Sequence, residues 1–122
     1  MSRRKLLDAL RQLQQERRRL LQRLTQEHEL ALGSVSMVAR KCGKPSCHCA
    51  SGSGHPQVLF LFKDAQGQRR CKLVRRADEA RLLRAGERYR EFGEDLKRLR
   101  AIDQREKQIL MALRDARALR YE

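Results

Sequence analysis

The stretch that decides the fold is Cys42-Gly43-Lys44-Pro45-Ser46-Cys47-His48-Cys49, and His55 follows six residues after its last cysteine. Thiols this close in sequence seldom pair with one another, but they suit a soft metal ion that takes sulfur and imidazole ligands in tetrahedral geometry. We therefore predict a structural zinc site, or zinc knuckle. Its ligands are expected to be Cys42, Cys47, Cys49 and His55.

Three residues are candidates for the fourth ligand. His55 is preferred because the small residues 51–54 let the chain return to the thiols. Cys71 lies on a predicted strand, where a small buried side chain is the ordinary interpretation. His48 stands between two ligands, so its ring should point away from the metal. The alternative to any metal site is a set of four unligated thiols.

Catalysis by these residues is not expected. A catalytic zinc keeps one position open and works with a general base, but Asp64, in a predicted hairpin loop, is the only acidic residue of 33–74. Basic neighbours of Cys42 would lower a thiol pKa, so a thiol redox sensor is an alternative. We predict that the protein is not an enzyme.

Residues 2–32 contain neither proline nor glycine, and their leucines recur with alternating spacings of four and three. This pattern predicts one long helix with a narrow apolar stripe, ended by Gly33. The stripe consists of Leu6, Leu10, Leu13, Leu20, Leu24 and Ala31, with Arg17 and Glu27 in the remaining positions.

Residues 34–74 have the character of a small antiparallel sheet. Period-two alternation over 34–40 and the apolar run 58–62 predict two strands. Residues 64–68 have the composition of a hairpin loop, and 69–74 form the expected returning strand. This segment also holds all four cysteines, so the β-hairpin and the Cys-rich knuckle share it.

Helical periodicity returns over residues 77–120, where Gly93 is expected to bend or split the helix. A second stripe consists of Leu96, Leu99, Ile102, Ile109, Leu110 and Leu113. Two striped helices around a compact centre predict a single α+β domain, residues 1–122. The N- and C-terminal helices would form an antiparallel, coiled-coil-like hairpin around the sheet. An intermolecular coiled coil would bury the same stripes.

The charge points to a polyanionic partner. The chain has 29 basic and 15 acidic residues, a net charge of +14, and residues 33–74 hold seven basic residues against Asp64. Such a cluster can neutralise phosphates, so we predict a nucleic-acid surface, without distinguishing DNA from RNA. Its residues are Arg40, Lys41, Lys44, Lys63, Arg69, Arg70 and Lys72. Phe60 and Phe62 share one side of a strand, as core residues or as a base-stacking platform.

The cellular setting follows from the cysteines and the N-terminus. Residues 1–5 lead into leucines interrupted by Arg and Gln, without the apolar stretch of an export signal. No run approaches the roughly 18 apolar residues of a membrane span. We expect a cytoplasmic protein with reduced thiols and no membrane contact, rather than one with disulfides.

The residues Arg40-Lys41-Cys42-Gly43-Lys44-Pro45-Ser46-Cys47-His48-Cys49, with Gly52, Gly54 and His55, resemble a family of small bacterial and archaeal proteins described as a domain of unknown function, often near transposase genes. The likeness covers about residues 34–100. Family members commonly continue the His with Gly-Pro-Tyr, whereas this chain has Pro56-Gln57-Val58.

The resemblance implies a metal-binding accessory protein associated with nucleic acid and mobile elements, and it favours His55 over Cys71 as a ligand. The function expected is therefore that of a non-enzymatic, zinc-stabilised nucleic-acid-binding protein. The alternative is a protein-interaction adaptor. Its helical stripes would pair with another protein, such as a transposase, or with a second copy of this chain.

Overall fold

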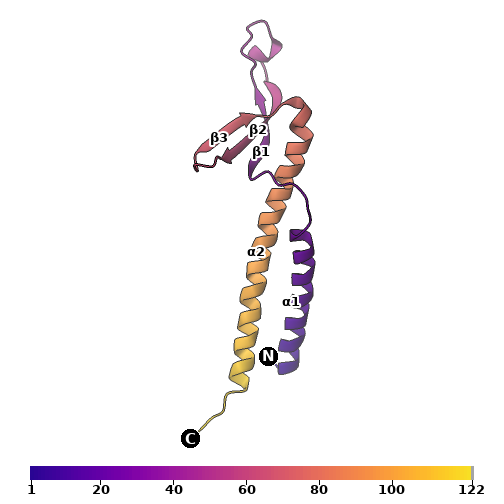
Figure 1. Cartoon of the computed structure of the whole chain (residues 1–122), viewed down its shortest axis with the longest axis vertical. Coiled ribbons are helices and arrows are strands. Elements are labelled where there is room, and N and C mark those ends of the chain that lie inside the picture. Colours follow the sequence, from indigo (N-terminus) through magenta and orange to yellow (C-terminus); the bar gives the residue numbers. More distant parts are fainter. Residues whose placement is uncertain (122) are drawn as a thin grey trace. The chain divides into compact units, whose positions relative to one another are not determined.

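The computed structural model describes residues 1–121, which fall into two compact units. Unit 1 takes Met1–Glu27 and the chain from Phe92 onward, and unit 2 is His28–Glu91. The elements are α1 (Arg3–Leu24), β1 (Gly33–Arg40), β2 (His55–Lys63), β3 (Arg69–Leu73) and α2 (Glu79–Ala116), with the short 3-10 helices η1 (His48–Ala50) and η2 (Arg76–Asp78) (Figure 1). The predicted α+β class is confirmed.

Helix α1 begins as its sequence predicts but ends earlier. Ser2 is the N-cap, and its hydroxyl oxygen accepts a hydrogen bond from the Lys5 N–H at 3.3 Å. The predicted helix reached residue 32, whereas α1 ends at Leu24. At that end the Thr25 hydroxyl donates to the Leu21 carbonyl at 2.7 Å. This local bond offers the last turn a side-chain partner and competes with further helix.

Gly93 is expected to bend or split the C-terminal helix. Helix α2 is a single element that runs through Gly93, so the helix is not split there. An interior glycine costs about 1 kcal/mol relative to alanine, which is too little to stop a helix with good helix formers on both sides. Among residues 1–121, no helix has both the length and the apolar content of a membrane span.

Unit 1 buries a few apolar residues and surrounds them with ion pairs. The buried side chains are Leu6 and Leu20 of α1 and Ile102 and Ile109 of α2, all members of the two predicted stripes. Arg17, which occupies a stripe position, pairs with Asp103 and Glu106. These two carboxylates, Asp103 first, raise the pKa of the Arg17 guanidinium. Its charge is therefore fully matched within the unit.

Unit 2 is built on an antiparallel sheet with the order β1-β2-β3. The register places Met37 opposite Val58 and Val35 opposite Phe60, so the side chains of these four residues share one face of the sheet. The start of α2 lies on that face, because a Cβ at Gly86 would lie 2.8 Å from the Val35 side chain. Val58 is fully buried there.

The hairpin between β2 and β3 is organised by Asp64. One of its carboxylate oxygens accepts the N–H groups of Gln66 and Gln68 at 3.0 and 2.9 Å, and the other pairs with Arg70 at 2.9 Å. Gly67 has a φ of 79°, which L side chains rarely adopt. Arg70 first, and then the Gln68 N–H, hold the pKa of Asp64 below its ordinary value of 3.8.

We expect Asp64→Asn to weaken the hairpin at neutral pH, because the amide loses the charge that pairs with Arg70. A depressed pKa contributes stability that is fully present above pH 3.8 and is lost as the pH falls through the lowered value. The difference in free energy of unfolding between the two proteins should therefore be constant from neutral pH down to about pH 5 and shrink below it. Denaturation by urea at several pH values measures it. A difference that grows in acid would contradict this account.

Candidate metal centre

The connection between β1 and β2, residues 41–54, is the knuckle loop. Arg40, the last residue of β1, pairs in register with His55, the first residue of β2, so the loop starts and ends at one point of the ladder. Cys42 comes just after this pair, and Cys49 lies on η1. His55 is anchored in the sheet. The chain therefore leaves the ladder, turns, and brings its thiols back to a fixed imidazole.

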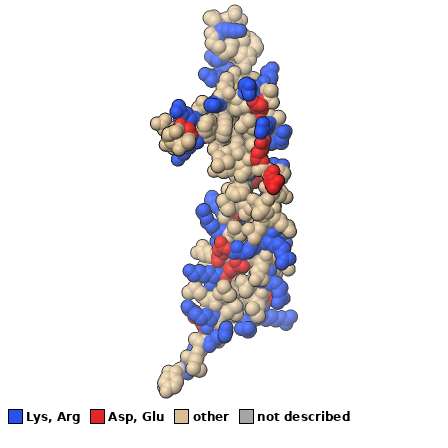
Figure 2. Space-filling model, viewed as in Figure 1, with Lys and Arg blue, Asp and Glu red and all other residues tan. Residues whose placement is uncertain are grey.

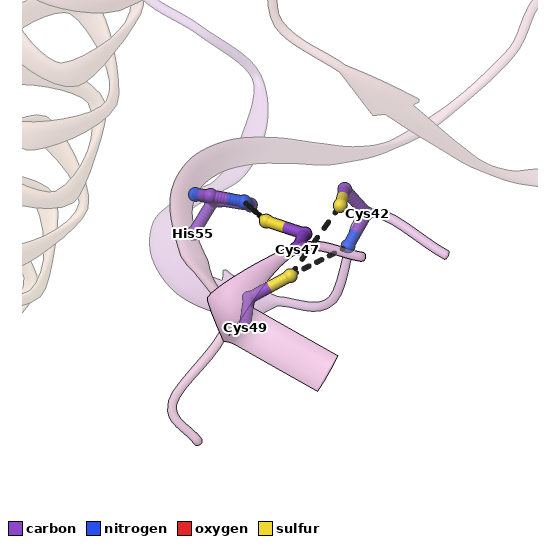
Figure 3. A group of neighbouring side chains, drawn as sticks. All are labelled: Cys42, Cys47, Cys49 and His55. Atoms are coloured by element: carbon purple, nitrogen blue, oxygen red, sulfur yellow. Dashed lines mark hydrogen bonds between the residues drawn. The ribbon is translucent and has the colours of Figure 1, made fainter. Parts of the chain in front are cut away.

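The four predicted ligand residues lie together (Figure 3). Their ligand atoms are all within 4.8 Å of one another. The Sγ atoms of Cys42 and Cys49 are 3.4 Å apart, and Cys47 Sγ is 3.2 Å from His55 Nε2. Ligands at ordinary zinc distances on a tetrahedron are separated by about 3.6–3.8 Å. The four residues, which we call the Cys3His group, are thus within reach of one ion and compatible with a metal such as zinc.

The Cys3His group is shielded on one side. Cys49 is 1% exposed, Cys47 and His55 are half-buried, and Cys42 is exposed. Structural zinc sites have four protein ligands, whereas catalytic sites keep one position open. Three thiols and one imidazole form a donor set that is compatible with a metal such as zinc.

The pKa values of Cys42 and Cys49 are shifted in opposite directions. The Lys44 N–H, followed by the Cys49 thiol, lowers the pKa of Cys42 to about 7. The largest influence on Cys49 is the Cys42 N–H, which donates to its Sγ at 3.4 Å and favours the thiolate. Burial and the neighbouring thiols of Cys42 and Cys47 outweigh it, so the pKa of Cys49 is raised. A bound cation would relieve the repulsion among these sulfurs, and its binding would release protons.

The knuckle loop has little else to hold it. The Cys47 N–H donates to the Lys44 carbonyl and the Ala50 N–H to the Cys47 carbonyl, both at 3.1 Å. Lys41 Nζ donates to the Ala50 carbonyl, also at 3.1 Å. Gly43 has a φ of 83°, so a residue with a side chain would be strained at this position. Apart from Cys49, no residue of 41–54 is buried, and an ion would supply the missing core.

The two competing ligands lie outside the Cys3His group. His48 is exposed on η1, with Nδ1 4.0 Å from Cys47 Sγ, and its ring packs edge-on against His55 at a centroid distance of 5.4 Å. Cys71 is exposed in the middle of β3. His48 can therefore orient the His55 ring, and Cys71 is a free surface thiol.

The seven predicted nucleic-acid-binding residues are all exposed and fall into two groups of unit 2. Arg40, Lys41 and Lys44 lie at the end of β1 and in the knuckle loop. The other four belong to the β2–β3 hairpin: Lys63, Arg69, Arg70 and Lys72. Lys and Arg side chains surround this hairpin on the face shown in Figure 2. The predicted platform of Phe60 and Phe62 is half-buried, with ring centroids 4.8 Å apart.

Comparison with known proteins places the chain in a family. The family model described as a domain of unknown function (DUF6788) matches residues 10–85. The chain belongs to this family. The match includes most of α1, the knuckle loop, the whole sheet and the start of α2. The predicted membership of a family of unknown function is confirmed. Neither the curated proteins nor the solved structures contain a match.

Two residues shape the site in ways that the sequence interpretation did not anticipate. The small residues 51–54 suggest a flexible return, but a Cβ at Gly54 would lie 2.4 Å from the carbonyl carbon of Arg40. Gly54 thus permits the close approach that seats His55. Asp64 is expected only as a loop residue, but its carboxylate accepts two backbone N–H groups of the turn and pairs with Arg70. A glycine directly before a strand, and an aspartate at the first position of a turn, are the signals for these roles.

Proposed function

We propose that this protein is a non-enzymatic, zinc-stabilised accessory protein that binds nucleic acid through the basic residues of unit 2. The observation that carries the proposal is the Cys3His group, whose four ligand atoms all lie within 4.8 Å of one another. Three thiolates and one imidazole select a soft ion with tetrahedral geometry, which favours zinc over calcium or magnesium. A bound zinc would cross-link the knuckle loop to β2.

The electrostatic balance of the knuckle supports an anionic partner. Three thiolates and one divalent ion sum to a charge of about −1. Arg40, Lys41 and Lys44 contribute three positive charges next to the Cys3His group. The net charge of this part of the chain therefore stays positive after the ion is bound. The hairpin adds four more basic residues and holds only Asp64 as an acid. This distribution fits a ligand that presents a row of phosphates, and the resemblance to proteins near transposase genes agrees with it.

Binding to a DNA duplex is expected to weaken at least about tenfold when salt rises from about 50 to about 200 mM, because several counterions are released. The double variant Arg40→Gln, Lys44→Gln should lower the slope of log affinity against log salt by about 1.8, or about 0.9 for each phosphate that is no longer neutralised. Fluorescence anisotropy of a labelled duplex measures both quantities.

The matched control for this experiment is Arg100→Gln, Lys107→Gln, which removes the same charge from α2 in unit 1. Both residues are exposed, and neither forms an ion pair within residues 1–121. The control should leave the slope within about 0.5 of the parent. An affinity that does not change with salt, or equal losses in both double variants, would refute the proposed surface.

For unit 1 we propose the antiparallel, coiled-coil-like helical hairpin. The order of its ion pairs supports this arrangement, because Glu16 pairs with Arg98 whereas Arg23, further along α1, pairs with Asp95, earlier in α2. The alternative function, a protein-interaction adaptor, draws support from the apolar side chains that unit 1 leaves exposed. On α1 and α2 these include Leu21, Leu96, Leu110 and Met111, exposed by 44, 37, 55 and 43%.

A further inference from the structure

A groove in unit 2 combines aromatic, apolar and basic side chains. It has a volume of about 590 Å³, within the range of ordinary ligand sites. Its lining consists of Leu32, Gly33, Leu61, Phe62, Lys63, Arg69, Arg70 and Tyr89. These residues come from the start of β1, the β2–β3 hairpin and α2, so the groove is formed within one compact unit. Among residues 1–121, no Asp or Glu lines it.

The positive charges in this groove favour binding of an anion. Lys63 and Arg69 are directly opposite each other in the β2–β3 ladder, and like charges at such positions repel each other. Neither forms an ion pair within residues 1–121, whereas Arg70 is satisfied by Asp64. Two exposed cations held face to face without a counterion are a ready site for a phosphate, which both can contact.

The aromatic side chains in this groove suit a base. Tyr89 is 37% exposed, and Phe62 is half-buried. The ring of Phe60 lies 4.8 Å from that of Phe62 at an angle of 31°, so the two rings pack against each other. The whole chain has only five aromatic residues. Two of the five therefore line one groove, and stacking on such rings is how bases of any sequence are held.

A second hollow beside the first makes a useful contrast. It shares Leu32, Phe62 and Lys63 with the groove but also contains Glu29, which is paired with Arg81 through two bonds of 2.6 and 2.9 Å. That carboxylate would repel a phosphate, and Arg81, which lines the same hollow, is already paired with it. The groove at Tyr89 is the better site for a nucleotide.

We propose that this groove holds a single-stranded nucleic acid, with a base against Tyr89 and Phe62. Lys63 and Arg69 leave the hairpin on the face opposite to Phe62, so they would hold the phosphate of a neighbouring nucleotide. The inference rests on the proposed function and makes it more specific, because bases in a duplex are stacked on each other and cannot reach the rings. Duplex binding would then depend on charge alone, and binding of a single strand on both charge and stacking.

The test uses the zinc-loaded full chain, a labelled single strand of about 12 nucleotides, and a duplex of the same sequence. Tyr89→Leu should lower affinity for the single strand by roughly 5- to 100-fold and leave duplex affinity within about twofold. Its salt slope should not change, because the substitution removes no charge. Tyr89→Phe, which keeps the ring, should bind the strand at least about fivefold more tightly than Tyr89→Leu.

The cations of the groove give an independent signature. Lys63→Gln, Arg69→Gln should lower the salt slope for the single strand by about 1.4, or about 0.7 for each phosphate that is no longer neutralised, and Arg100→Gln, Lys107→Gln should not. If the Tyr89→Leu protein bound the single strand as tightly as the parent, the proposal for the groove would be wrong. Salt-dependent binding of the duplex would still support the proposed function in that case. Adenosine monophosphate binding as tightly as the strand would also overturn the proposal for the groove. If the parent protein bound neither the single strand nor the duplex, both the proposal for the groove and the proposed function would be refuted.

Discussion

Cys49→Ser is expected to abolish stoichiometric metal binding, whereas Cys71→Ser should leave one zinc ion per chain. Cys49 is the most buried of the four cysteines, at 1% exposure, and its Sγ lies 3.4 Å from Cys42 Sγ. A serine hydroxyl does not ionise at neutral pH and is a hard donor, so it replaces a thiolate poorly on zinc. We expect zinc affinity to fall at least about 100-fold, beyond the effect of losing an outer hydrogen bond.

The measurement combines metal content with a probe of the knuckle loop. Protein loaded with one equivalent of zinc and then desalted is analysed for metal. Brief digestion with trypsin, followed by mass spectrometry of the fragments, measures cleavage after Lys41 separately from cleavage after Arg40 and at other sites, and Pro45 blocks cleavage after Lys44. The parent and Cys71→Ser should keep the ion and resist cleavage after Lys41. Cys49→Ser and the chelated parent should lose the ion and be cut there, because the loop has no other core.

Cys71→Ser is a matched control because the same atom is replaced in the same sheet-containing unit, at an exposed position outside the Cys3His group. Zinc retained by Cys49→Ser with unchanged affinity would contradict the proposed ligands. A thiol sensor behaves differently from a structural site. If the thiols act as a redox sensor, an oxidant and not a chelator should change cleavage after Lys41. The oxidant could join Cys42 and Cys49 in a disulfide, because their sulfurs are already 3.4 Å apart.

The sequence predicted the site better than it predicted the fold around it. Ligand chemistry is local, so the spacing of Cys42, Cys47 and Cys49 and the return to His55 could be interpreted without any tertiary structure. The strands were also accessible, because β2 and β3 differ from the predicted runs by only a few residues at their ends. Their alternation and the hairpin composition are short-range signals.

The rest depends on contacts between distant segments. Helix periodicity continues past Leu24, but the Ala31 N–H donates to the Ala85 carbonyl at 3.0 Å instead of to its own helix. No sequence pattern near Ala31 predicts a hydrogen bond to a residue 54 positions further along the chain. The groove at Tyr89 was missed for the same reason, because Tyr89 looks like an ordinary helical residue until α2 is placed on the sheet of unit 2.

Gly54→Ala is expected to reduce both the stability of unit 2 and its affinity for zinc. A Cβ at this position would lie 2.4, 2.5 and 2.7 Å from the carbonyl carbon, nitrogen and Cα of Arg40. These are backbone atoms of a paired strand, so they cannot rotate away as a side chain would. Overpacking of this kind costs about 1–3 kcal/mol. Relief requires β1 and β2 to separate at the pair Arg40 and His55.

That separation moves an imidazole whose Nε2 must stay near Cys47 Sγ, now 3.2 Å away. Zinc affinity in a competition assay should therefore fall by about 10- to 100-fold, as for other losses of ligand positioning. Gly52→Ala is the control, because its nearest neighbour, the His48 carbonyl oxygen, would be 3.6 Å from the added carbon, an ordinary contact. It should change the free energy of unfolding by no more than about 1 kcal/mol and leave zinc affinity unchanged. Equal losses in the two variants would mean that loop flexibility, and not the approach of Gly54 to Arg40, positions His55.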